Sequence, residues 1–81
     1  MSAPRADPTD VALTLDCRGW KCPRPIIELA RRISEVEVGQ LIRLVADDPA
    51  AGPDVAAWCR MRRQELVSST PPEFLVRRVS G

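Results

Sequence analysis

The chain has 81 residues, of which 12 are lysine or arginine and 11 are aspartate or glutamate, so its formal net charge is +1. A chain of this length forms one domain with one core, and its balanced charge gives no overall attraction to nucleic acid or to a membrane surface. No segment has the roughly 18 apolar residues that a membrane-spanning helix needs, and the amino end lacks the apolar run of a signal peptide. We therefore expect a cytoplasmic protein whose three cysteines are reactive or buried thiols rather than a disulfide framework.

The first half of the chain predicts a tail, a strand and a helix. Prolines and few large apolar groups predict a flexible tail over 1–10, followed by a single domain over 11–81. Alternating residues predict a strand over 11–15. A helical period begins at Pro23, which suits the first position of a helix because proline lacks an amide hydrogen. The expected inward stripe of this helix consists of Ile26, Ile27, Leu29, Ala30 and Ile33.

The second half of the chain predicts a strand, a helix and two closing strands. The mostly apolar residues 41–46 are typical of a strand that is buried on both faces. A loop rich in proline and aspartate over 47–53 leads into the second helix. The closing strands are expected over 65–69 and 74–79.

The order of predicted elements is therefore β-α-β-α-β-β, which defines the fold class as α/β. We expect a two-layer sandwich in which both helices cover one face of a four-stranded mixed sheet. The right-handed crossover rule makes the first two strands a parallel pair. Nothing in the chain demands an assembly larger than a monomer.

Cys22 is the expected reactive residue. Because it directly precedes Pro23, it is expected at or beside the N-cap of the first helix, where free N–H groups and the helix dipole favour a thiolate. Arg18, Lys21 and Arg24 are expected to stabilise the thiolate or a persulfide anion. The alternative for Cys22 is a small buried residue at a helix end, which explains the rigid, basic context Lys-Cys-Pro-Arg-Pro poorly. The chain has no histidine, so a Cys–His dyad is excluded.

The other thiols and the nearby tryptophan have two interpretations each. Cys17 is either a small residue at the end of the first strand or a resolving thiol that reacts with Cys22. Cys59 is expected in the core. Cysteines at this spacing without histidine are a poor zinc site, so we expect no metal. Trp20 either packs the loop or offers an apolar rim to a docking partner.

Charged residues outside this segment are expected to have structural or solvated roles. Asp47 and Asp48, which precede Pro49, are expected to accept hydrogen bonds from backbone amides rather than to form an acid–base pair. Five arginines form either a solvated face or a basic surface for RNA or an acidic partner. These arginines are Arg60, Arg62, Arg63, Arg77 and Arg78. With one phenylalanine and two tryptophans for base stacking, we do not expect direct contact with nucleic acid.

The segment Leu15–Pro25 resembles the Cys-Pro-X-Pro signature of the TusA (SirA-like) sulfur-carrier family. The residues Leu44–Pro49 are similar to the acidic loop that follows the second strand in this family, and Trp58-Cys59 with Glu65–Val67 resembles its second helix and third strand. The resemblance covers roughly residues 12–79. Within it, several residues take structural positions of the motif. These are Asp16, Gly19, Pro23, Pro25, Asp47, Asp48 and Pro49.

The resemblance implies the same sandwich fold and a function. Cys22 would accept persulfide sulfur from a cysteine desulfurase or a rhodanese-like donor and pass it to an acceptor protein, with no cofactor besides that transient sulfur. Known roles of the family include tRNA thiolation, molybdenum-cofactor maturation and sulfur metabolism, and the sequence does not select among them or between sulfur and selenium. Arg24 at the variable motif position favours an acidic partner face. Two alternatives stay open: a non-catalytic RNA- or protein-binding regulatory module, and a redox switch that uses Cys17 and Cys22.

Overall fold

The computed structural model describes residues 11–80, and in this part of the chain the elements follow the predicted order β-α-β-α-β-β. The tail expected over 1–10 lies outside the described residues. The strands are β1 (Val11–Asp16), β2 (Leu41–Val45), β3 (Glu65–Thr70) and β4 (Glu73–Arg77). The helices are α1 (Arg24–Arg32) and α2 (Ala51–Arg62), and a short 3-10 helix, η2 (Ile33–Glu35), continues directly from α1.

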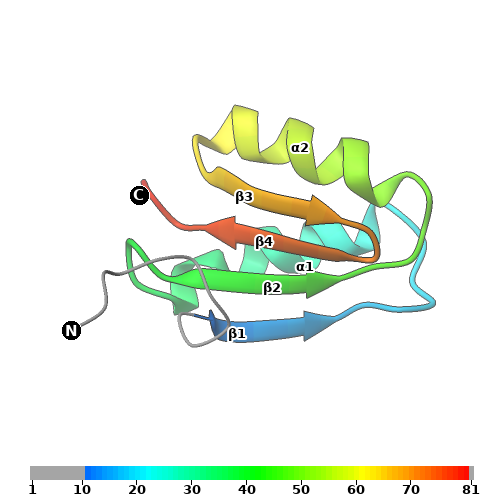
Figure 1. Cartoon of the computed structure of the whole chain (residues 1–81), viewed down its shortest axis with the longest axis horizontal. Helices are drawn as coiled ribbons and strands as arrows, with labels where there is room; N and C mark the ends of the chain where they lie inside the picture. The colour runs from blue at the N-terminus through cyan, green and yellow to red at the C-terminus, as the bar shows by residue number, and fades with distance from the viewer. Residues whose placement is uncertain (1–10, 81) are drawn as a thin grey trace.

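The four strands form one mixed sheet in the order β1-β2-β4-β3. β1 pairs with β2 in parallel, whereas β4 pairs with β2 and with β3 in antiparallel fashion. Both helices lie against one face of this sheet and begin at the same end of it (Figure 1). The predicted fold class, a two-layer α/β sandwich, is confirmed.

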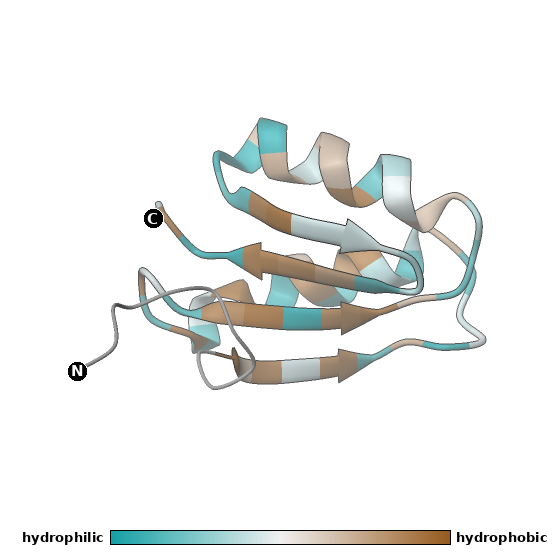
Figure 2. Cartoon of the chain, in the orientation of Figure 1, coloured by the Kyte–Doolittle hydropathy of each residue, from teal (hydrophilic) through white to brown (hydrophobic). Residues whose placement is uncertain are grey.

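A single core fills the space between the two layers. Alternate residues of the strands point toward the helices, because successive side chains of a strand face opposite sides. Apolar residues dominate the central strands β2 and β4 (Figure 2). The buried side chains contributed by the two layers include Leu15, Ile42, Leu44, Phe74 and Val76 from the strands and Leu29, Ile33, Val55 and Trp58 from the helical segments. Each fully buried side chain of this size contributes about 1.5–3 kcal/mol to folding, before conformational entropy is subtracted.

The prediction that the second strand is buried on both faces is wrong in part. Ile42 and Leu44 are buried in the core, but Arg43 lies on the opposite face, where its guanidinium binds the Glu73 carboxylate at 2.7 Å. Both side chains of this pair are about half exposed. A two-layer sandwich leaves one face of its sheet to solvent, and an apolar pattern alone does not separate this case from a fully covered strand.

Helix α1 differs from its prediction in two details. It begins at Arg24, with Pro23 as the N-cap, so it starts one residue later than expected. Ile27 is also 57% exposed, although the expected inward stripe includes it. Pro25 and Leu29 are the buried residues of α1, and Ile27 lies about 200° around the helix axis from Pro25.

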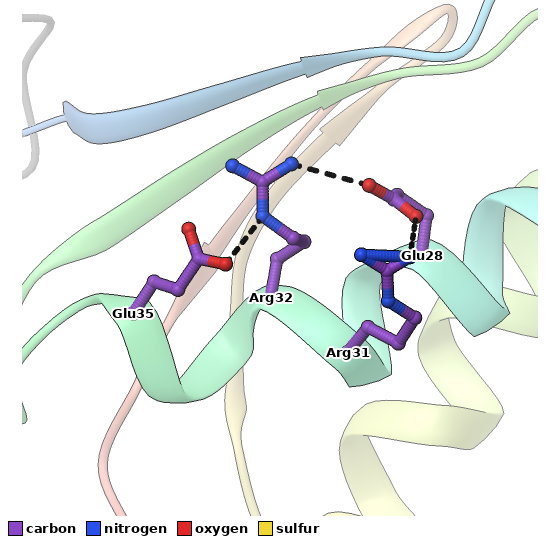
Figure 3. A network of polar contacts seen from close by, with 4 residues as sticks. All are labelled: Glu28, Arg31, Arg32 and Glu35. Atoms are coloured by element: carbon purple, nitrogen blue, oxygen red, sulfur yellow. Dashed lines mark hydrogen bonds and ion pairs between the residues drawn. The ribbon is translucent and has the colours of Figure 1, made fainter.

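The solvent side of α1 carries a chain of ion pairs that continues into η2 (Figure 3). Glu28 binds Arg31 at 3.3 Å and Arg32 at 3.2 Å, and Arg32 also binds Glu35 at 2.7 Å. Pairs at this spacing on a helix surface add about 0.2–0.5 kcal/mol each. They stabilise the end of α1 that is distant from Cys22.

Candidate functional site

Cys22 lies in the connection between β1 and α1, directly before the N-cap residue Pro23. The Arg24 N–H donates to the Lys21 carbonyl at 2.9 Å, and the Ile26 and Ile27 N–H groups donate to the Pro23 carbonyl at 3.0 Å. The helix N-cap has no side-chain hydrogen bond. Cys22 is therefore held beside the N-cap by a backbone turn, the second of its two expected positions.

The three cysteines differ sharply in accessibility. Cys17 and Cys59 are 1% and 3% exposed and belong to the core. Cys22 is half-buried and packs against the outside of the core. Burial raises the pKa of Cys17 and raises the pKa of Cys59 to about 11. All three are free thiols. Cys22 is consequently the thiol that a partner can reach most easily, and the expected core position of Cys59 is confirmed.

A hydrogen bond between two loops positions the segment around Cys22. Gly19 has φ +82°, which favours glycine, and its N–H donates to the Asp47 carboxylate at 3.0 Å. Three residues earlier in the chain, Asp16 accepts from the Arg18 side chain at 2.8 and 2.9 Å, and Arg18 lowers the pKa of Asp16 to about 2. The loop after β2 thus holds the Cys22 loop in place.

Asp48 has a different role in the same loop. Its carboxylate accepts from the Ala50 N–H at 2.8 Å, and its carbonyl accepts from the Ala51 N–H at 2.9 Å. Helix α2 begins at Ala51, inside the segment expected to be loop, because these two bonds start the helical turn early. Asp47 and Asp48 therefore both bind backbone amides, but only Asp48 acts at the second helix.

The basic residues near Cys22 interact mainly with other groups. Arg18 is bound to Asp16, as described. The guanidinium carbon of Arg24 lies 4.0 Å from the centroid of the Trp20 ring, a cation–π contact. Trp20 is half-buried and packs against the core, while Lys21 is exposed. Trp20 as a partner contact stays a prediction.

The electrostatic expectation for the free Cys22 thiol is wrong in direction. Its pKa is raised, not lowered. Partial burial is the largest cause, and the negative charge of Asp48 follows. The Asp54 carboxylate also raises the pKa. The nearby sequence is basic, but the groups that face the sulfur across space are acidic.

Asp54 is the residue of this site that the sequence pattern does not single out, since it lies 32 positions after Cys22. It occupies the first turn of α2. The topology of the fold, in contrast, predicts that Asp54 lies near Cys22. Because β1 and β2 are parallel and each is followed by a helix, both helices start at the same edge of the sheet.

A hollow of about 400 Å³ opens beside Asp48, between the loop after β2, the start of α2 and the β3–β4 hairpin. Its lining is Ala46, Asp47, Asp48, Pro49, Gly52, Pro53, Pro71, Pro72 and Phe74. The prolines give it rigid walls, and Asp47 and Asp48 give it negative charge. Within residues 11–80, no group of three or more Cys, Asp or Glu side chains is arranged to hold a metal ion.

This fold and site define a small α/β domain with one accessible thiol before a helix, suited to taking up and releasing a group by attack of sulfur. The family model described as Sulfurtransferase TusA matches residues 13–77. This match spans most of the chain, and the chain belongs to the TusA sulfurtransferase family. It therefore has a general sulfur-carrier role with partners that donate and accept sulfur. None of the helices in the described region is long and apolar enough to cross a membrane.

Proposed function

We propose that this protein carries persulfide sulfur on Cys22. The Cys22 thiolate attacks the terminal sulfur of a donor persulfide, a new S–S bond forms, and the donor cysteine leaves as a thiolate. In the second step, an acceptor thiolate attacks the terminal sulfur on Cys22, and the Cys22 thiolate leaves. Each step exchanges one S–S bond for another, so no external oxidant or reductant is needed.

The observation that carries this proposal is the accessibility of Cys22 in a chain of the TusA family. The other two thiols are buried in the core, where a donor protein does not reach them. Family membership supplies the chemistry, and the position of Cys22 before α1 supplies the candidate sulfur.

Arg18, Lys21 and Arg24 keep their proposed role, but they act on the persulfide rather than on the free thiol. An added sulfur atom lies about 2 Å beyond Sγ. We infer that the terminal charge then lies closer to solvent, where the exposed Lys21 side chain is free to adjust and Arg24 lies over the neighbouring Trp20 ring. These cations stabilise the loaded form.

The proposed donor is a cysteine desulfurase or a rhodanese-like protein, and the proposed acceptor is a protein thiol in tRNA thiolation, molybdenum-cofactor maturation or sulfur metabolism. We further propose that the protein acts in the cytoplasm as a monomer, with no bound cofactor besides the transferred sulfur. Trp20 beside Cys22 would contact the partner.

The test is sulfur loading by a cysteine desulfurase with pyridoxal phosphate and free cysteine, followed by intact and peptide mass measurement. We expect a gain of one sulfur atom on the peptide that contains Cys22, reversed by a thiol reductant. Cys22→Ser should gain none. If neither a desulfurase nor a rhodanese loads the wild-type protein while each loads a control carrier, the proposal is wrong. The regulatory module or the redox switch would then replace it.

A further inference from the structure

Trp20 and Arg24 form a contact that spans Cys22. The guanidinium carbon of Arg24 lies 4.0 Å from the centroid of the Trp20 ring, which is close contact between a cation and a ring face. Trp20 stands two positions before Cys22 in the chain, and Arg24 stands two positions after it. The contact therefore joins the two sides of the short segment that carries the accessible thiol.

Both partners of this contact are anchored. Trp20 is half-buried and packs against the core, and its N–H donates to the Cys17 carbonyl at 3.1 Å. Arg24 is the first residue of α1, and its N–H donates to the Lys21 carbonyl at 2.9 Å. Helix side chains lean toward the N-terminus of their helix, which directs the Arg24 side chain back toward Cys22. The guanidinium thus has a fixed place although Arg24 is exposed.

The contact leaves the hydrogen-bonding edge of Arg24 open. A ring covers one face of the planar guanidinium, whereas the N–H donors lie in its plane. Arg18 is bound to Asp16, but Arg24 takes part in none of the ion pairs of residues 11–80. Lys21 is exposed and also takes no part in them. Arg24 therefore combines a fixed position with unused donors beside the thiol.

A fixed cation matters here because the proposed reaction brings anions to Cys22. The donor persulfide approaches as an anion, and the loaded form keeps a negative charge. Asp48 and Asp54, whose charges raise the pKa of the Cys22 thiol, repel such an anion. A guanidinium that is already ordered offsets this repulsion without a further loss of side-chain entropy at each reaction.

We propose that Trp20 is a positioning residue that holds the Arg24 guanidinium beside Cys22, and that this pair makes Cys22 selective for anionic reaction partners. This inference rests on the proposed function, which it deepens by naming the charge of the group that Cys22 takes up. Trp20 acts through Arg24 and needs no contact with the partner for this role. The pair forms and breaks no covalent bond, so the balance of the two transfer steps is unchanged.

The first test compares the alkylation of Cys22 by iodoacetate, an anion, with its alkylation by neutral iodoacetamide, both read from the Cys22 peptide. Both reagents consume the same thiolate and release iodide, so the ratio of their rates is independent of the thiolate fraction. Arg24→Gln should lower the ratio of iodoacetate to iodoacetamide about twofold to threefold, the effect of one charge several ångströms away in water. Arg31→Gln removes the same charge two helical turns further along α1 and should leave the ratio nearly unchanged.

Trp20 variants test whether the ring positions this charge. Trp20→Leu keeps Arg24 but removes the ring, so the ratio should fall by most of the change seen in Arg24→Gln. Trp20→Phe keeps a ring face and should restore most of the wild-type ratio. The double variant Trp20→Leu, Arg24→Gln should show no further fall, because two residues that act through one contact have non-additive effects.

Two results would overturn the proposal: an unchanged ratio in folded Trp20→Leu, or a fall in the double variant that equals the product of the two single effects. If Trp20→Leu does not fold, Trp20→Met takes its place, since methionine fills irregular space and has no ring. The same two results then decide.

The second test observes the contact itself by NMR. Protons that lie over the face of an aromatic ring are shifted upfield, so the Arg24 side-chain protons should resonate upfield of those of Arg31. This difference should disappear in Trp20→Leu. If the Arg24 and Arg31 protons of the wild-type protein resonate together, the ring does not hold the guanidinium and the proposal is wrong.

Neither test uses a sulfur donor, so the two proposals fail separately. If no donor loads Cys22, the proposed function fails while the alkylation ratios stand. If the donor loads Cys22 and the ratio is the same in all variants, only the selectivity assigned to Trp20 and Arg24 fails.

Discussion

The two ends of the molecule use charged side chains in different ways. Both helices begin at one end of the molecule (Figure 1). At this end Asp48 and Asp54 raise the pKa of the half-buried Cys22 thiol, and neither has a cationic partner among the ion pairs of residues 11–80. At the opposite end, arginines bind backbone carbonyls and carboxylates. Arg78 donates to the Val36 carbonyl at 2.6 Å, and Arg77 donates to the Gly39 carbonyl at 3.0 Å and to Glu65.

The sign of the charge in a sequence segment therefore does not give the sign of the charge at a site. The segment around Cys22 is basic, yet its arginines bind an aspartate and an aromatic ring. Two of the five arginines considered as an RNA surface, Arg77 and Arg78, bind carbonyls of the loop that precedes β2. Arg60, Arg62 and Arg63 are the exposed members of that set.

Removal of Arg78 should affect folding and leave sulfur chemistry intact. Arg78→Met deletes the hydrogen bond to the Val36 carbonyl and leaves that acceptor without its donor. We expect the free energy of unfolding to fall by about 2 kcal/mol, measured by urea titration. The folded fraction should still take up sulfur on Cys22. Loss of sulfur uptake with unchanged stability would contradict the separation of the two ends.

Alkaline pH should destabilise the protein through Cys59. Because burial raises its pKa to about 11 from the ordinary 9.0, the unfolded chain loses this proton first. Stability is therefore fully present below about pH 9 and is lost as the pH rises toward about 11. The loss from this group should approach about 2 kcal/mol. Urea titrations at several pH values between these two give the free energy of unfolding as a function of pH. This free energy should fall less steeply with pH in Cys59→Ala than in the wild-type protein, and an equal fall would contradict this assignment.

Loss of the contact between the loops should affect Cys22 more than the fold. Asp47→Ala leaves the Gly19 N–H without its acceptor and should cost about 1 kcal/mol in unfolding free energy. The Cys22 loop becomes less well positioned, so the rate of sulfur loading should fall several-fold. Asp47→Asn keeps an oxygen acceptor and serves as the matched control. Equal loading in all three proteins would show that this bond does not position Cys22.

The exposed arginines at the far end should have the smallest effect. Replacement of Arg60, Arg62 and Arg63 by glutamine should change the loading rate by less than about twofold, because exposed charges far from the sulfur are screened at physiological salt. The measurement is the single-turnover loading rate with a desulfurase. A tenfold decrease would move the partner surface to this end of the molecule.

The order of elements was predictable from the sequence because hydrophobic periodicity indicates each helix and strand, and turn residues indicate where each one ends. Sheet burial was less predictable, since Leu41–Val45 reads as an apolar strand although Arg43 lies on the open face. The inward stripe of α1 was wrong at Ile27 because neighbouring isoleucines do not reveal which of them faces the sheet.

The reactive residue was predictable, but its electrostatic surroundings were not. Cys22 stands in a local motif that can be read from adjacent residues. Asp54, whose carboxylate raises the pKa of this thiol, lies in α2, and only the parallel pairing of β1 with β2 brings the start of α2 to this edge. Local sequence predicts chemistry that depends on neighbours in the chain, whereas the pKa of a thiol depends on neighbours in space.

The most direct test of Cys22 as the sulfur carrier uses a protein in which it is the only cysteine. The variant Cys17→Ala, Cys59→Ala retains Cys22 alone. A desulfurase should load one sulfur atom onto this variant to the same extent as onto the wild-type protein, and Cys22→Ser should take up none. Loading of Cys22→Ser, or failure of the folded variant with Cys22 alone to load, would contradict the account.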